Sequence, residues 1–188
     1  MSSGGDRIAS MIATMISDIR VLRLSEEWCD PTACGPEEGL CPGGDPVVRW
    51  AHHRQLELCD KLELLADSLP ANVDRMTCLY VANTLVPSLR DIHRYEEQVV
   101  FPAYEAIAGI GSRESTIRRL RMEHLEDECF ADEVTEVLLA IGHGRPIANA
   151  EATGFMLRGL FETMRRHVAF EREHVMPMLD RKCGPLPG

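Results

Sequence analysis

The feature that most constrains this 188-residue chain is a repeated pairing of a histidine with a glutamate four residues later. Each pair lies inside an apolar stripe with helical spacing, and residues four apart in a helix lie on the same face. A solvated ion pair would lie opposite the stripe, so these side chains are predicted to point inward. The three pairs are His93 and Glu97, His124 and Glu128, and His167 and Glu171.

The apolar stripes also define the helices. They predict four of them, at about residues 45–68, 71–107, 113–141 and 149–182. Asp45 followed by Pro46 is a helix start signal, and we expect kinks at Pro87 and Pro102 and a perturbation near Pro177. No segment alternates with period two. Four long helices with short connections predict an all-α, up-down-up-down antiparallel four-helix bundle.

The segment that precedes this bundle differs in composition. Residues 1–44 combine an amphipathic helix with a linker rich in cysteine, glycine and proline, and we place a domain boundary between them and residues 45–183. The spacing of Cys29, Cys34 and Cys41 matches no zinc motif, although a redox or metal role for these thiols stays open. An amphipathic arm on a complete bundle is compatible with a homodimer.

Charge and composition exclude several classes of protein. The formal net charge of −10 argues against binding to nucleic acid or to an anionic membrane. No apolar run is long enough to span a membrane, and the first residues lack the pattern of a signal peptide. The seven cysteines form an odd set without an export signal, so a disulfide framework is not expected. We expect a cytoplasmic protein.

The histidine–glutamate pairs also lie at matching depths along the bundle. Counted from Gly111, His93 and Glu97 lie 18 and 14 residues back, and His124 and Glu128 lie 13 and 17 residues forward. At ~1.5 Å per residue these levels agree within about one turn. A similar agreement holds between the third and fourth helices. All six side chains are therefore predicted to meet at one place.

The first helix offers two further candidates, His52 and His53. His53 has a glutamate at the fourth following position, Glu57, which favours it by motif. His52, however, is in phase with the apolar stripe of this helix, and phase is the stronger physical argument. We therefore choose His52. His143 is expected in a loop, and His174 could support the site from outside.

Four histidines and three glutamates that converge in a helical bundle predict a metal site. Imidazole and carboxylate suit iron, manganese or zinc, whereas calcium prefers oxygen ligands alone. Buried carboxylates are costly unless they are paired or bind metal. Seven ligands are too many for one ion. If Glu97 and Glu171 bridge two metals and an oxo or hydroxo group also bridges them, about one position stays open for a small molecule.

The segments that carry these residues resemble a known family. "HHRQLELCDKLELLADSLP", "HRYEEQVVFPAYE", "MEHLEDE" and "HVAFEREHVMPML" are similar to the hemerythrin-like, or HHE cation-binding, domain over about residues 45–182. The resemblance implies a four-helix bundle around a non-haem di-iron centre. By position it implies the metal ligands His52, His93, Glu97, His124, Glu128, His167 and Glu171.

The resemblance also sets expectations for function. It implies binding of oxygen, sensing of oxygen or iron, or reaction with peroxide or nitric oxide. The oxygen-carrying members have a histidine in place of Glu128 and an aspartate in place of Arg172. The additional carboxylate argues against reversible oxygen carriage, and it makes manganese or a mixed Fe/Mn centre plausible.

Two functions follow from these expectations. The first is a di-iron protein that reacts with oxygen, peroxide or nitric oxide, and a peroxidase or oxidase type of activity stays open. The alternative is a sensor or regulatory protein that acts through a partner docked on its N-terminal segment. The sequence contains no nucleophile–base pair and no phosphate-binding loop, so it identifies no organic substrate.

Overall fold

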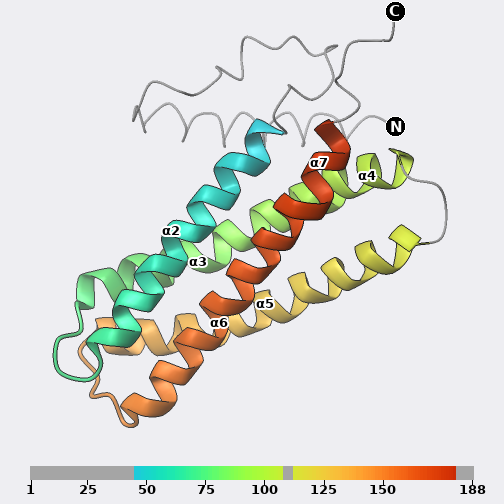
Figure 1. Cartoon of the computed structure of the whole chain (residues 1–188). Coiled ribbons are helices and arrows are strands. Elements are labelled where there is room, and N and C mark those ends of the chain that lie inside the picture. Colours follow the sequence, from blue (N-terminus) through green and yellow to red (C-terminus); the bar gives the residue numbers. More distant parts are fainter. Residues whose placement is uncertain (1–44, 108–111, 181–188) are drawn as a thin grey trace, which may run out of the picture. The chain divides into compact units, whose positions relative to one another are not determined.

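A computed structural model describes residues 45–107 and 112–180, which belong to one compact unit. Helices occupy most of these residues, and the described part of the chain contains no strand (Figure 1). The prediction of an all-α helical bundle is confirmed. The elements are α2 (Pro46–Ser68), α3 (Arg75–Tyr95), η1 (Glu96–Val100), α4 (Phe101–Ile107), α5 (Ser112–Gly142), α6 (Ala150–Phe170), η2 (Glu171–Val175) and α7 (Met176–Asp180).

Several predictions concern residues outside these ranges. The N-terminal arm, its role in a dimer or in docking a partner, and the thiols of Cys29, Cys34 and Cys41 all fall within residues 1–44. The last residues assigned to the bundle, 181–183, also lie outside the described ranges. Within the described ranges, no helix is both long and apolar enough to cross a membrane.

The helices form four rods, because α3, η1 and α4 follow one another along one line, as do α6, η2 and α7 (Figure 1). Successive rods run in opposite directions. Helix α2 packs against α3 and α6, and α5 packs against the same two helices from the other side. Each rod therefore presents one face to a shared interior.

Short polar side chains set where three helices begin. Asp45 accepts a hydrogen bond from the Val47 backbone N–H (2.8 Å), with Pro46 at the first helical position. Asp74 accepts from the Met76 N–H (2.9 Å), which starts α3 a few residues later than the predicted residue 71. Asn149 caps α6 in the same way. Each cap satisfies a backbone donor that has no partner within the helix.

Prolines disturb the rods in two places, where they follow π-helical turns. In η1 the backbone N–H of Phe101 donates to the Glu96 carbonyl five residues back, directly before Pro102. In η2 the N–H of Met176 donates to the Glu171 carbonyl, directly before Pro177. Proline lacks a donor and crowds the carbonyl four residues earlier, which favours a wider turn. By contrast, α3 continues as a helix through Pro87.

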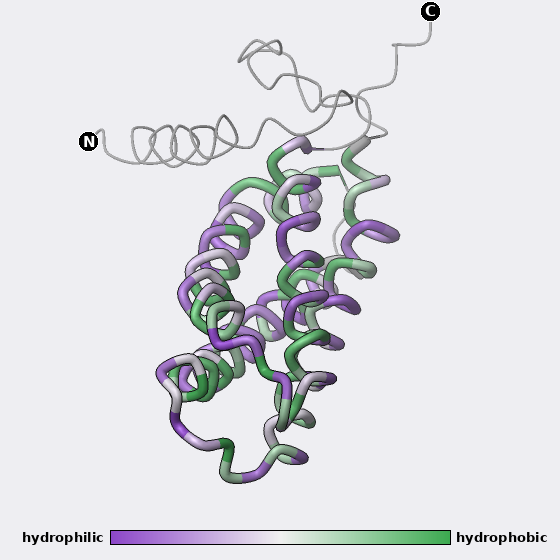
Figure 2. Tube along the Cα trace, turned by 90° about the vertical axis from the view of Figure 1, so that its left-hand side faces the viewer, coloured by the Kyte–Doolittle hydropathy of each residue, from purple (hydrophilic) through white to green (hydrophobic). Residues whose placement is uncertain are grey.

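The interior contains two separate apolar clusters with a polar layer between them. One includes Leu58 of α2, Leu89 of α3 and Met164 of α6. The other includes Val48 at the start of α2 and Val175 in η2. Figure 2 shows hydrophobic and hydrophilic residues alternating along each helix, as an amphipathic bundle requires. The polar layer interrupts all four rods at the same depth.

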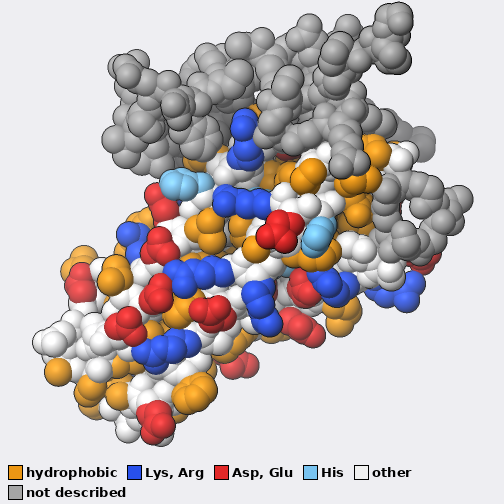
Figure 3. Space-filling model, viewed as in Figure 1, with side chains coloured by type: hydrophobic (Ala, Val, Ile, Leu, Met, Phe, Trp, Pro, Cys, Tyr) orange, Lys and Arg blue, Asp and Glu red, His pale blue; other side chains and the backbone are white. Residues whose placement is uncertain are grey.

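The outer surface of the bundle is charged. Lys and Arg side chains lie among Asp and Glu on the face in Figure 3. Arg165 of α6 pairs with Asp60 and Glu63 of α2 at 2.8 and 2.7 Å, and Arg158 pairs with Asp67 at 2.7 Å. Such exposed pairs contribute little to stability. The polar residues that indicate a function are therefore those of the buried polar layer.

Candidate metal centre

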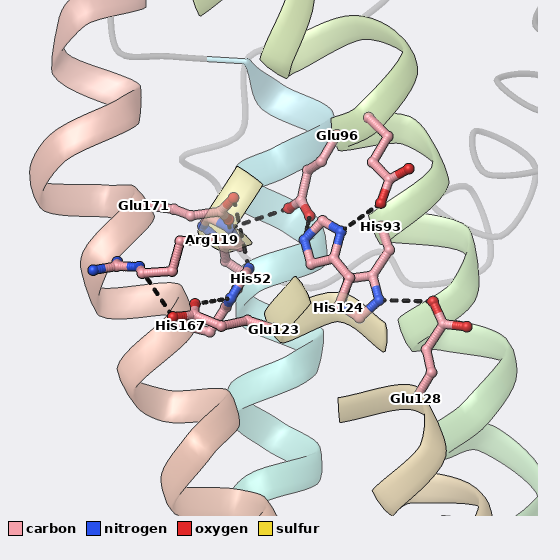
Figure 4. A network of polar contacts seen from close by, with 10 residues as sticks. His52, His93, Glu96, Arg119, Glu123, His124, Glu128, His167 and Glu171 are labelled. Carbon is pink, nitrogen blue, oxygen red and sulfur yellow. Dashed lines mark hydrogen bonds and ion pairs between the residues drawn. The ribbon is translucent and has the colours of Figure 1, made fainter. Parts of the chain in front are cut away.

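Each of the four rods contributes one histidine to the polar layer (Figure 4). None of the four is more than 5% exposed, although histidine is usually only partly buried. The rings of two of them stack with their centroids 3.9 Å apart and their planes 5° from parallel. These two are His93 and His124, and the others are His52 of α2 and His167 of α6.

Two glutamates lie among these histidines. Glu96 and Glu171 are 1% and 0% exposed, and each is the first residue of a π-helical turn. His52 Nε2 lies 2.9 Å from Glu171 Oε2 and 3.6 Å from Glu96 Oε1. Glu96 Oε2 lies 3.3 Å from His124 Nε2, and Glu171 Oε1 lies 3.7 Å from His167 Nε2. Both carboxylates therefore bridge between histidines from different rods.

Five polar atoms of Glu96, Glu171, His124 and His167 have no hydrogen-bond partner. They are both carboxylate oxygens of Glu96, one oxygen of Glu171, and the Nε2 atoms of His124 and His167. The ligand atoms of these four side chains all lie within 4.8 Å of one another. Unpaired polar atoms in a protein interior are costly. A divalent cation would satisfy all of them at once, and imidazole with carboxylate is a donor set that iron, manganese and zinc accept.

The electrostatics of the layer favour positive charge. Burial lowers the pKa of His52 and His124, but hydrogen bonds and charges from the neighbouring glutamates outweigh burial and raise both values. The same balance raises the pKa of His167 to about 10. His93 differs, because burial and the neighbouring histidines lower its pKa to about 2. A metal cation would replace the protons that the carboxylates draw to the layer.

Three of the histidines also have a carboxylate on their outer side. The Nδ1 atom of His93 lies 2.9 Å from Glu128 Oε1, and that of His124 lies 3.0 Å from Glu97 Oε1. His167 Nδ1 lies 3.1 Å from an oxygen of the α5 residue Glu123. A histidine that donates from Nδ1 to a carboxylate directs the lone pair of Nε2 to the opposite side, as metal-ligating histidines commonly do.

The structure brings together most of the residues predicted from sequence. His52 points inward, whereas His53 is 60% exposed beside Glu57. His93, His124, His167 and Glu171 also lie in the layer. The remaining two candidates lie outside it: Glu97 is 40% exposed and Glu128 is 25% exposed.

The difference at Glu97 and Glu128 has a geometric reason. Glu96 lies seven residues, close to two full turns, after the buried Leu89, so Glu96 is better in phase with the stripe than Glu97. On α5, Asp127 has the same relation to Leu120 and is buried, whereas Glu128 is not. The apolar phase thus turns Glu96 and Asp127 toward the interior, and the metal-ligand role predicted for Glu97 and Glu128 stays a prediction.

Two further acidic residues were missed. Arg119 lies four residues before Glu123, and in the sequence the two resemble an ordinary surface ion pair. The hydrogen bond between Glu123 and His167 depends on how α5 and α6 pack. Burial raises the pKa of Asp127, which hydrogen-bonds to Thr163. Residues that include Glu123, Asp127, Thr163 and His167 line a pocket of about 350 Å³ between α5 and α6. This pocket reaches the outer side of the layer.

The remaining histidines lie away from the layer. His174 is 56% exposed, and its ring lies edge-on to Phe170 at a centroid distance of 4.6 Å. His143 is exposed beyond the end of α5. Neither touches the buried cluster in the contacts of the described residues. They are therefore not part of the candidate metal centre.

Comparison with known proteins agrees with this geometry. The model of the hemerythrin HHE cation-binding domain matches residues 45–179, which include all four rods and every residue of the polar layer. No curated protein and no solved structure is similar enough to count as a match. The match covers more than half of the chain, and it includes the buried cluster of Glu96, His124, His167 and Glu171. The chain belongs to the hemerythrin HHE cation-binding domain family.

Proposed function

We propose that this protein holds two iron ions in the polar layer, and that this centre reacts with a small molecule such as oxygen, peroxide or nitric oxide. The observation that carries the proposal is the convergence of buried, unpaired nitrogen and oxygen atoms from all four rods. The residues proposed to hold the metal are His52, His93, Glu96, His124, His167 and Glu171.

The number of donors supports two ions. Four imidazoles and two bridging carboxylates would fill about eight of the roughly twelve positions around two six-coordinate ions. A bridging oxo or hydroxo group would fill about two more. The few remaining positions suit a diatomic molecule or peroxide, and manganese or a mixed Fe/Mn centre satisfies the same count.

The position of Glu128 changes one expectation. From sequence, a third inner carboxylate argued against reversible oxygen carriage, because it adds negative charge at the metals. Glu128 lies on the outer side of His93 and is 25% exposed. The inner set therefore contains two carboxylates and four imidazoles, which removes that argument. Oxygen binding and redox chemistry with peroxide or nitric oxide are both compatible with this set.

The chain itself contributes binding, orientation and exclusion of water. Bound iron would supply the electrons for redox chemistry. Glu96 and Glu171 reach between rods and would hold both ions, and the carboxylates on the outer sides fix the histidine rings. The apolar clusters on either side of the layer keep bulk water away. The pocket beside His167 lies on the outer side of the layer, where Glu123 contacts the Nδ1 atom of that ring.

Metal analysis of the full-length protein, loaded anaerobically with Fe(II), tests the proposal. We expect about two iron ions per chain and near-ultraviolet charge-transfer bands that change when peroxide is added. His52→Ala should lower the iron content. The adjacent His53→Ala is the matched control, because His53 is 60% exposed and should retain full content. Wild-type protein that binds no iron, manganese or zinc would refute the proposal.

A further inference from the structure

The histidine–glutamate motifs of α3 and α5 exchange partners. Glu97 of η1 lies four residues after His93 of α3, but its carboxylate lies 3.0 Å from the Nδ1 atom of His124 on α5. Glu128 follows His124 on α5 but lies against His93 of α3, at 2.9 Å from its Nδ1. The two histidine rings are stacked between these glutamates. Each motif therefore orients the histidine of the other helix.

The third outer bond follows the same pattern. Glu123 of α5 lies 3.1 Å from His167 Nδ1 on α6. Arginines hold two of the three carboxylates: Arg119 Nε is 3.1 Å from Glu123, and Arg90 Nε is 3.3 Å from Glu128. All three bonds thus join α5 to a neighbouring rod. His52 is the exception, because its Nδ1 is buried without a partner.

Chemistry assigns a direction to these bonds. An ionised carboxylate can only accept, so the Nδ1 atom of each histidine must carry the hydrogen. A neutral ring protonated at Nδ1 has its remaining lone pair on Nε2. For His124 and His167, Nε2 is the atom that lies unpaired in the layer. The outer carboxylates thereby select the tautomer that can bind a cation.

We propose that Glu97, Glu123 and Glu128 are positioning residues that do not bind the metal themselves but set its affinity through His124, His167 and His93. This inference rests on the proposed metal centre, and it gives Glu97 and Glu128 no direct ligand role despite their His-x-x-x-Glu spacing. Loss of such an outer partner typically lowers metal affinity about 10- to 100-fold.

The test uses Zn²⁺, a diamagnetic probe, on the full-length protein. Competition with a chelator measures affinity and stoichiometry, and long-range ¹H–¹⁵N spectra of the imidazoles report the tautomer. Glu97→Ala and Glu128→Ala are expected to bind as many ions as wild type with about 10- to 100-fold lower affinity. The corresponding Gln variants are expected to lose less, because an amide oxygen still accepts from Nδ1.

Asp132→Ala is the matched control. Asp132 pairs with Arg90, the same arginine that contacts Glu128, and its Oδ2 atom lies 2.7 Å from Arg90 Nη2. It is 54% exposed and contacts no histidine of the layer. It is expected to keep wild-type affinity and the wild-type imidazole spectrum. Because Glu97 and Glu128 are partly exposed, their Ala variants should fold, and melting of the metal-free proteins verifies this.

The outcomes separate the two proposals. If Glu97→Ala or Glu128→Ala lowers the number of Zn²⁺ ions bound at saturation, that glutamate is a ligand and the positioning role is refuted. If both variants match Asp132→Ala in affinity and tautomer, the positioning role is also refuted while the metal centre stands. Wild-type protein that binds no Zn²⁺, iron or manganese overturns the metal centre itself.

Discussion

Replacing Glu96 by methionine should change the stability of the metal-free and metal-loaded proteins in opposite directions. Glu96 is 1% exposed, and neither carboxylate oxygen has a hydrogen-bond partner. Its contacts with His52 and His124, at 3.6 and 3.3 Å, are ion pairs without hydrogen-bond geometry. Methionine has a similar length and helix propensity, and its flexible side chain adapts to irregular space. The substitution therefore removes an unsatisfied buried group with little change in packing.

The magnitude follows from the cost of an unpaired buried group. Removing it should raise the free energy of unfolding of the metal-free protein by about 1–3 kcal/mol. For a domain of this size, each kcal/mol raises Tm by about 2–4 °C. Glu96 helps to raise the pKa of His52 and His124, so the lost ion pairs offset part of this gain below those pKa values, and the full gain is expected above them, where both histidines are neutral. In wild type, metal at about 1,000 times its Kd should add ~4 kcal/mol, and most of this should be absent in the variant.

Thermal unfolding followed by circular dichroism, with excess chelator and then with excess Fe(II) under anaerobic conditions, measures both effects. The matched control is Glu97→Met, because Glu97 is the next residue and is 40% exposed. Glu97→Met should not stabilise the metal-free protein. If Glu96→Met lowers the Tm of the metal-free protein, Glu96 is satisfied in the native state and the reasoning from unpaired atoms fails.

Three further predictions concern the rest of the bundle. Cys59 and Cys78 should resist alkylation at pH 8 and at pH 9 until the protein unfolds, because burial raises their pKa values to about 12 and about 11; peptide mass spectrometry should find the exposed Cys129 modified before either of them. Tyr95→Phe should lower the free energy of unfolding by about 1–2 kcal/mol, measured by denaturant titration, because the buried Tyr95 hydroxyl donates to Asp45 at 2.5 Å; an unchanged midpoint would contradict this. Gly142→Ala should cost about 1–3 kcal/mol in the same assay, because its Cβ would lie 2.6 Å from the Leu79 side chain, and a neutral result would mean that Leu79 moves freely.

The fold was readable from the sequence because every long segment had a single apolar stripe. The stripes, together with the start signal at Asp45 and Pro46, predicted the number, type and approximate ends of the helices. The π-helical turns were predicted only as disturbances at Pro102 and Pro177, since a proline specifies a lost hydrogen bond but not how the backbone adapts.

The site was readable only where a residue lies within its own stripe. His52 was chosen over His53 by phase, and the structure buries His52. Glu123 could not have been found, because its role depends on which face of α6 packs against α5. The partner exchange between Glu97 and Glu128 was also hidden, because spacing along one helix contains no information about the rotation of its neighbour.

The polar layer has a consequence for how the molecule comes apart. It separates two apolar clusters, so few apolar contacts connect one end of the bundle with the other. A cation held by side chains from all four rods would connect the rods at the level of this layer. Without it, the short end that contains α4 and α7 can fray while the longer end stays folded. Metal binding would then make the unfolding of the two ends more cooperative.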